Sequence, residues 1–236
     1  MIKNQKFNFI ICILLIFTST SFSQTKTVKS KKNNPFDLSN YKAEPKDRLL
    51  LEFIHCGWNN LPKGVQTDWF SRGANFQLFF DHPLGTSNFS LAYGCGISSH
   101  NVSGNMNVYT IHDSLGGGIN LIARDQPYKK NIFGAKIIEV PAEIRFRTRK
   151  ARSFKISLGF KVGYTVQNFN KIFDADGKRK LFDIEGFNPI RYGPTIRLGF
   201  EEVYIAGFYS LSPTFNKGGK KTEIFPYTIG IGITPW

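Results

Sequence analysis

Residues 139–147 read Glu-Val-Pro-Ala-Glu-Ile-Arg-Phe-Arg, so apolar side chains alternate with mostly charged ones along this stretch. Successive side chains of a β-strand point to opposite faces of the sheet. One face of the stretch is therefore apolar, and the other carries Glu139, Glu143, Arg145 and Arg147. A soluble sheet shows the same alternation, so the interpretation depends on whether the pattern recurs along the chain.

The alternation does recur, and it is cleanest over Phe154–Gln167. Phe, Ile, Leu, Val and Tyr face one way there, and Lys, Ser, Gly, Thr and Gln face the other. Counting such segments between turn signals predicts eight strands. They run at about Leu49–Trp58, Gly73–Asp81, Asn88–Ser98, the segment containing residues 139–147, Phe154–Gln167, Arg191–Phe200, Val203–Leu211 and Thr228–Thr234.

The predicted connections alternate between short and long. Short turns join the second strand to the third, the fourth to the fifth and the sixth to the seventh. The longer joins lie at about Asn59–Arg72, Ser99–Ile132, Asn168–Pro189 and Ser212–Ile224. Bacterial outer-membrane barrels combine an even strand count with short periplasmic turns and longer outer loops. We therefore predict an all-β fold, an eight-stranded antiparallel up-and-down transmembrane β-barrel, over residues 47–236.

The N-terminal segment has the three parts of a secretory signal. Lys3 and Lys6 precede an apolar run, Phe7–Phe17, and small residues end the segment at Ser23. The run has roughly half of the ~20 apolar residues that a membrane-spanning helix needs, so we predict a cleaved signal peptide over residues 1–23. Residues 24–46 are polar and basic, and we expect them to form a flexible basic tail in the periplasm. The expected location is the outer membrane.

A soluble periplasmic barrel that buries its apolar face around a ligand is the main alternative for the fold. It would place Lys155 and Lys161 outside, which is chemically reasonable. Two features favour the membrane barrel: a polar face rich in Gly and Ser, which suits a crowded lumen, and aromatic side chains near strand ends, as in an interfacial girdle. The expected girdle residues are Trp58, Tyr93, Tyr164, Tyr192, Tyr204, Tyr227 and Trp236.

Three segments, Trp69–Phe76, Glu139–Arg147 and Tyr209–Phe215, resemble the PorT-like outer-membrane β-barrel family of Bacteroidota. The resemblance covers essentially the whole mature domain and implies an outer-membrane barrel. The namesake of the family is associated with type IX protein secretion, so the resemblance implies an association with secretion-machinery proteins. It brings no catalytic residues with it.

Inward-facing charged residues are the main functional candidates. An eight-stranded barrel has an interior just filled by side chains, so charges inside it must be paired. We expect a lumenal charge network of Glu52, Glu139, Glu143, Arg145, Lys161, Arg191 and Arg197, with Asp81, Arg147 and Lys155 also facing inward. Such a network would hold the barrel rigid in a structural or interaction role. A small gated channel is one alternative.

A lipid-modifying outer-membrane enzyme is the other alternative, and it would need a nucleophile and a base near one rim. His55 and His100 lie near the expected outer strand ends, and His100 follows Ser98 and Ser99. No acid is visibly placed to orient either histidine. We therefore expect no enzyme and no catalytic residues.

Cofactor motifs are incomplete in this sequence. The stretch Asp174–Gly177 resembles the start of a calcium loop but lacks the downstream Glu, and Gly116–Gly118 lacks the lysine of a phosphate-binding loop. We therefore expect neither a cofactor nor a metal.

The net charge of +14 would suit a nucleic-acid-binding protein, but the signal peptide and the barrel argue against that partner. Basic residues instead gather in the predicted outer loops. They are Lys129, Lys130, Lys178, Arg179, Lys180, Lys217, Lys220 and Lys221. Lipopolysaccharide phosphates are a suitable counter-charge, although ordinary solvated loops explain the same residues. The expected partners are outer-membrane lipid, lipopolysaccharide and secretion-machinery proteins.

Overall fold

The computed structural model describes residues 49–111, 118–148, 153–175, 177–217 and 220–234, without the side chains of 110, 111, 118, 120, 217, 220 and 221. The expected signal peptide and basic tail, residues 1–23 and 24–46, lie outside these ranges. Every regular element in the described part is a β-strand, and no helix there is long and apolar enough to cross a membrane.

The strands follow one another along the chain with short or irregular connections. They are β1 (Leu49–Asn59), β2 (Arg72–Pro83), β3 (Phe89–Ser103), β4 (Met106–Ile111), β5 (Gly118–Ala123), β6 (Lys130–Arg147), β7 (Phe154–Asp174), β8 (Gly177–Phe182), β9 (Ile190–Phe200), β10 (Val203–Tyr209), β11 (Asn216–Lys217), β12 (Lys220–Lys221) and β13 (Phe225–Ile233).

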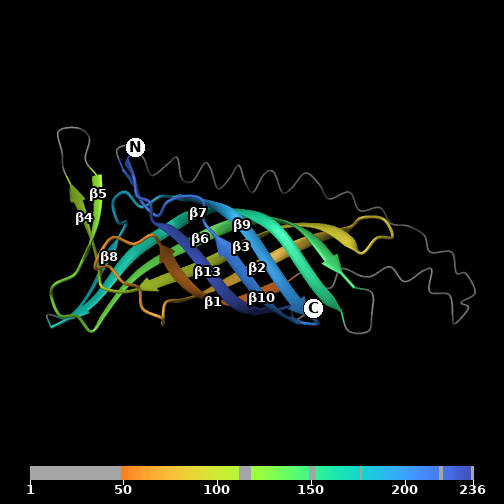
Figure 1. Cartoon of the computed structure of the whole chain (residues 1–236), viewed down its shortest axis with the longest axis horizontal. Helices are drawn as coiled ribbons and strands as arrows, with labels where there is room; N and C mark the ends of the chain where they lie inside the picture. Colours follow the sequence, from red (N-terminus) through yellow and green to blue (C-terminus); the bar gives the residue numbers. More distant parts are fainter. Residues whose placement is uncertain (1–48, 112–117, 149–152, 176, 218–219, 235–236) are drawn as a thin grey trace, which may run out of the picture. The chain divides into compact units, whose positions relative to one another are not determined.

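Eight of the described strands close into a ring (Figure 1). The order is β1, β2, β3, β6, β7, β9, β10 and β13, and β13 pairs back onto β1. Each of these pairs is antiparallel, and the order of the strands around the ring is also their order along the chain. The predicted all-β, eight-stranded antiparallel up-and-down barrel is confirmed, and each predicted strand corresponds to one strand of the ring.

Alternation along the strands separates a polar lumen from an apolar wall. On β6, Glu139 and Glu143 are buried in the barrel, whereas Val140 and Ile144 are exposed on the wall. The same parity holds on β9, where Arg197 is buried between exposed neighbours. An outward apolar band around a polar interior is the arrangement of an outer-membrane barrel, because lipid rather than water surrounds the wall.

A β-bulge on β7 changes which of its side chains point inward. The pairing with β6 passes over one residue, Val166, so the register shifts by one position there. Lys161 and Thr165 are buried before the bulge, and Asn170 is buried after it. Side chains in a strand have a period of two, so one extra residue moves the inward face to the other parity. The inward side chains of β7 therefore have odd residue numbers before the bulge and even residue numbers after it.

Part of the sequence expected as long connections forms strands instead. β3 and β6 both extend into the expected connection Ser99–Ile132, and β4 and β5 form a separate hairpin within it (Figure 1). β8 pairs with the outer part of β7, and β11 pairs with β12. Pairing satisfies the backbone donors and acceptors of these segments. The long connection predicted at about Ser99–Ile132 is therefore present, but it is shorter than predicted and contains a hairpin of its own.

The aromatic girdle predicted from the strand ends is wrong for two of its residues. Trp58 and Tyr204 point into the barrel and are only 7% and 6% exposed. Each of them occupies the same alternate positions of its strand as the other buried residues. This alternation decides which face a side chain is on, however close the residue lies to the end of the strand. Tyr93 and Tyr192 are exposed as expected, Tyr164 and Tyr227 are half-buried, and Trp236 lies outside the described residues.

Candidate functional site

The centre of the lumen is organised around one guanidinium group. Arg197 Nε donates to Glu52 Oε1 at 2.7 Å, and its Nη2 donates to Gln77 Oε1 at 2.5 Å. Arg197 also forms a salt bridge with Glu143. These partners come from β1, β2 and β6, so a single side chain on β9 links four strands across the interior. The planar fork of an arginine suits this task because its donors point in several fixed directions.

Other buried polar residues extend the contacts of Arg197 along the barrel. Lys161 Nζ donates to Glu139 Oε2 at 3.0 Å, and Gln77 Nε2 reaches the same oxygen at 3.4 Å. Arg145 Nε donates to Glu143 Oε2 at 3.1 Å. Breaking a buried pair by removing one partner costs about 3–5 kcal/mol, so these contacts constrain one another. The structure thus joins six of the seven expected network residues by hydrogen bonds or ion pairs, and among the described residues Arg191 has no such contact with them.

Two lumenal phenylalanines support the cations and were not expected from the sequence. The Arg145 guanidinium lies 4.2 Å from the Phe79 ring centroid. Lys161 Nζ and the Arg191 guanidinium lie 4.3 and 4.4 Å from the ring centroid of Phe208. Desolvated cation–π contacts of this kind contribute up to about 2 kcal/mol. The inward position of Phe79 could have been predicted from the sequence, because Phe79 lies two residues after Gln77 on the same strand and therefore faces the same way.

Arg191 contacts a histidine instead of a carboxylate. Its Nη1 lies 2.8 Å from His100 Nδ1, and both residues are buried. His55, the other histidine considered for catalysis, is on the wall side of β1 and stacks on Trp69 at 5.3 Å between ring centroids. The two histidines therefore do not share a site, and His100 is oriented by a cation.

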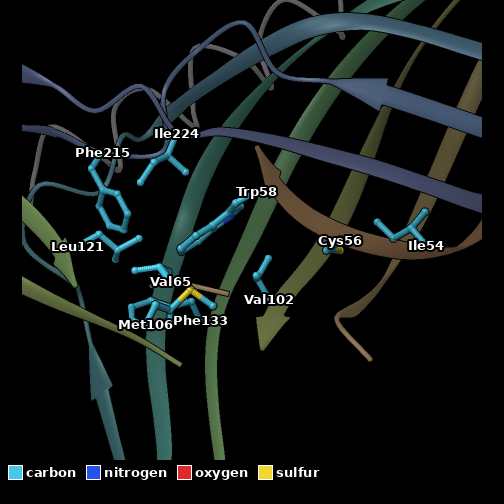
Figure 2. Close-up of a cluster of buried hydrophobic side chains, with 10 residues drawn as sticks. All are labelled: Ile54, Cys56, Trp58, Val65, Val102, Met106, Leu121, Phe133, Phe215 and Ile224. Atoms are coloured by element: carbon cyan, nitrogen blue, oxygen red, sulfur yellow. The ribbon is translucent and has the colours of Figure 1, made fainter. Parts of the chain in front are cut away.

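An apolar cluster of buried side chains lies at the end of the lumen where the longer connections are (Figure 2). Trp58 is central to it and packs against Phe133 and Phe215, with ring centroids 5.7 and 5.8 Å apart. The connections contribute Val65, Met106, Leu121 and Ile224, which pack against Ile54, Cys56 and Val102 from the barrel. We call this set, including Trp58, Phe133 and Phe215, the outer cap. Apolar side chains from β4, β5 and the β10–β13 connection thus close the mouth of the barrel.

The other end of the lumen, beside the short connection between β2 and β3, holds the remaining inward charges. Arg147 Nη2 lies 4.0 Å from Asp81 Oδ2. A cavity of about 30 Å³, lined in part by Lys155, Arg197 and Tyr204, opens at this end. A cavity needs roughly 10–15 Å³ to hold one water molecule, so this space admits about two waters and no large solute.

Most of the expected lipopolysaccharide-contacting residues lie together on the outer strands. Lys130 on β6 is opposite Phe173 on β7, and Phe173 is opposite Lys178 on β8. Lys129, Lys130, Lys178, Arg179 and Lys180 are all exposed, and we call these five residues the basic outer surface. Lys180 Nζ lies 4.3 and 4.5 Å from the ring centroids of Phe169 and Phe182. The side chains of Lys217, Lys220 and Lys221 lie outside the described part of the chain.

The family model described as outer membrane protein beta-barrel domain matches residues 17–216. The chain belongs to this family. The matched range contains seven of the eight ring strands found among the described residues, and β13, which closes the ring, follows it. No curated protein and no solved structure matches the chain. The outer-membrane barrel domain is therefore shown by both the family and the fold.

Proposed function

We propose that this outer-membrane barrel is a closed, non-enzymatic protein with a structural or interaction role. The supporting observation is the double closure of its lumen. The network around Arg197 fills the middle of the interior, and the outer cap covers its outer mouth. A closed lumen leaves the wall, the outer strands and the N-terminal tail for contacts with partners.

Conductance measurement tests the closed state. Purified protein in planar bilayers is expected to show no stable open level, since eight strands leave an interior that side chains fill. A persistent large conductance would contradict the proposal and support the gated channel. Insertion is checked separately, by protection of the barrel strands from protease added to the same lipid in vesicle form, so that the absence of current reports a closed barrel and not a failure to insert.

The basic outer surface is our proposed contact for lipopolysaccharide. The ammonium groups of Lys178 and Lys180 lie beside phenylalanine rings, so phosphates and acyl chains would meet matching chemistry within one surface. The test is binding of purified lipopolysaccharide to the protein in detergent, for the wild type and for Lys178→Gln/Lys180→Gln. We expect weaker binding by the variant and a steeper dependence on salt in the wild type, because exposed charges are screened by salt.

A matched control removes the same charge from another part of the outer end. Lys63 and Arg72 are exposed, and the Arg72 guanidinium lies 5.2 Å from the Phe70 ring centroid. The double variant Lys63→Gln/Arg72→Gln should bind lipopolysaccharide as the wild type does. Equal losses in the two double variants would mean that binding follows net charge and not this surface.

Association with type IX protein secretion is our proposed biological setting, and it rests on the resemblance to PorT-like barrels. Comparing the secreted proteins of a deletion strain with those of its parent tests the setting directly. We expect loss of secreted cargo that returns when the wild-type gene is restored. Unchanged secretion together with altered lipid A would instead support a lipid-modifying enzyme.

A further inference from the structure

A cavity with a mostly apolar lining lies beside the outer cap, and Trp58, Val102 and Phe133 of the cap form part of its wall. Its volume is about 40 Å³, and its lining includes His100, Thr165, Arg191, Ser212 and Thr214. At roughly 10–15 Å³ per water, this volume holds about three waters or one small ion. The lining also includes the exposed residue Ile190, so the cavity extends toward the surface beside the start of β9.

Arg191 brings an uncompensated set of donors to this cavity. Only 8% of its surface is exposed, and its Nε and Nη2 have no hydrogen-bond partner among the described residues. No salt bridge joins it to a carboxylate in the described part of the chain. The Glu139 carboxylate, which acts on Arg191 through space, is already bound by Lys161 and Gln77.

The protonation of His100 follows from its contact with Arg191. A guanidinium has no acceptor, so His100 Nδ1 must accept from Arg191 Nη1 at 2.8 Å. A neutral imidazole whose Nδ1 accepts carries its proton on Nε2. His100 Nε2 is buried and has no partner among the described residues. The two nitrogens of an imidazole face nearly opposite directions, so His100 Nε2 points away from Arg191, and the unsatisfied donors of the guanidinium are its Nε and Nη2.

Several other polar side chains of the lining already form hydrogen bonds within the protein. Thr214 Oγ1 donates to the Ile224 carbonyl at 3.0 Å, and Ser212 Oγ lies 3.0 Å from Ser210 Oγ. Asn188 Nδ2 donates to the Pro213 carbonyl at 3.0 Å, and its Oδ1 accepts from the Ile190 amide. The unsatisfied groups of Arg191 are donors, so a bound group must accept from them, and an anion does so while also supplying the negative charge that water lacks.

We propose that this cavity is a binding site for one small monovalent anion, a halide or a carboxylate group, held by the Nε and Nη2 edge of Arg191, with His100 orienting the guanidinium from its Nη1 side. An anion accepts from these two donors and neutralises a charge that otherwise lies buried without a carboxylate bound to it, which is costly. The Phe208 ring, 4.4 Å from the Arg191 guanidinium, holds the donor edge in place. The site is separate from the basic outer surface, whose residues are all exposed.

Unfolding of the full-length protein in urea, in detergent, tests the site with defined salts. Sodium chloride, sodium acetate and sodium gluconate are compared at equal ionic strength. A ligand that binds the folded state alone raises stability with concentration. We expect chloride or acetate to raise the unfolding midpoint in a saturating way, and gluconate, which is too large for the cavity, to have no such effect. A larger effect of acetate would identify a carboxylate as the preferred ligand.

Variants and diffraction separate this site from a general salt effect. The anion-dependent shift should disappear in Arg191→Met and fall in His100→Gln, and it should persist in the exposed control Lys63→Gln. The His100 variant keeps the test usable if Arg191→Met does not fold. Crystals grown in bromide should show an anomalous peak within hydrogen-bonding distance of Arg191 Nε and Nη2. Identical shifts in all variants, or a cavity containing ordered water and no bromide, would overturn the proposal.

Discussion

The Tyr204 hydroxyl donates a hydrogen bond of 3.3 Å to Glu52 Oε1, although β10 and β1 do not pair with each other. β13 lies between them, and its residue at this level is Gly232, which pairs with both Tyr204 and Glu52. The aromatic ring crosses the space that a side chain at position 232 would occupy. A glycine on the middle strand therefore allows an aromatic residue to join the lumenal network.

We expect Gly232→Ala to displace Tyr204 and destabilise the barrel. A Cβ at position 232 would lie 2.3 Å from the Tyr204 ring. Overpacking of this kind costs about 1–3 kcal/mol. The free energy of unfolding in urea, followed by tryptophan fluorescence, measures the loss. In a Tyr204→Ala background the same substitution should cost much less, and equal costs in both backgrounds would show that the two positions are not coupled.

Substitution of Arg197 should have the largest effect within the network. Arg197→Met leaves Glu52 and Glu143 buried without their shared cation, so we expect a loss of about 3–5 kcal/mol. The exposed control Lys63→Met should change stability by no more than about 0.5 kcal/mol. Adding Glu52→Gln and Glu143→Gln to Arg197→Met should restore part of the stability, because no unpaired charge then remains. No recovery would mean that Arg197 acts mainly through packing.

Labelling should distinguish the lipid-facing wall from the lumen. In a background with Cys56→Ala and Cys95→Ala, we place single cysteines at Leu158, which is 57% exposed, and at Thr195, which is 7% exposed. A lipid-soluble thiol reagent should label position 158 in vesicles and leave position 195 unlabelled until the protein is unfolded. Labelling in the opposite order would indicate a soluble barrel with an apolar interior.

Weakening the outer cap should open the outer connections without opening a pore. Phe215 is fully buried in the cap, and Phe→Ala substitutions in a core cost about 3–5 kcal/mol. We expect Phe215→Ala to speed hydrogen exchange of the β4 and β5 amides, and to leave conductance low because the Arg197 network still fills the lumen. The control Phe70→Ala removes a ring that is 70% exposed and should do neither. A stable conductance in Phe215→Ala would mean that the cap alone closes the barrel.

Strand positions and the facing of most residues could be predicted from the sequence. Over Phe154–Thr165 every expected inward and outward position agrees with the structure, because a two-residue period is a local property that needs no knowledge of neighbours. The prediction failed where local rules compete. Trp58 and Tyr204 lie near strand ends, which suggested a girdle, but their parity places them inside.

Contacts inside the barrel were decided by tertiary structure. The pairing of Arg197 with Glu52 joins residues 145 positions apart, and the bond between Arg191 and His100 joins residues 91 apart. Periodicity shows only that each of these side chains points inward. Which of them meet depends on how far each strand is shifted relative to the next around the closed ring, and on the bulge at Val166. Ring closure sets those shifts jointly for all strands, so alternation along a single strand determines the facing of a side chain but not its partner.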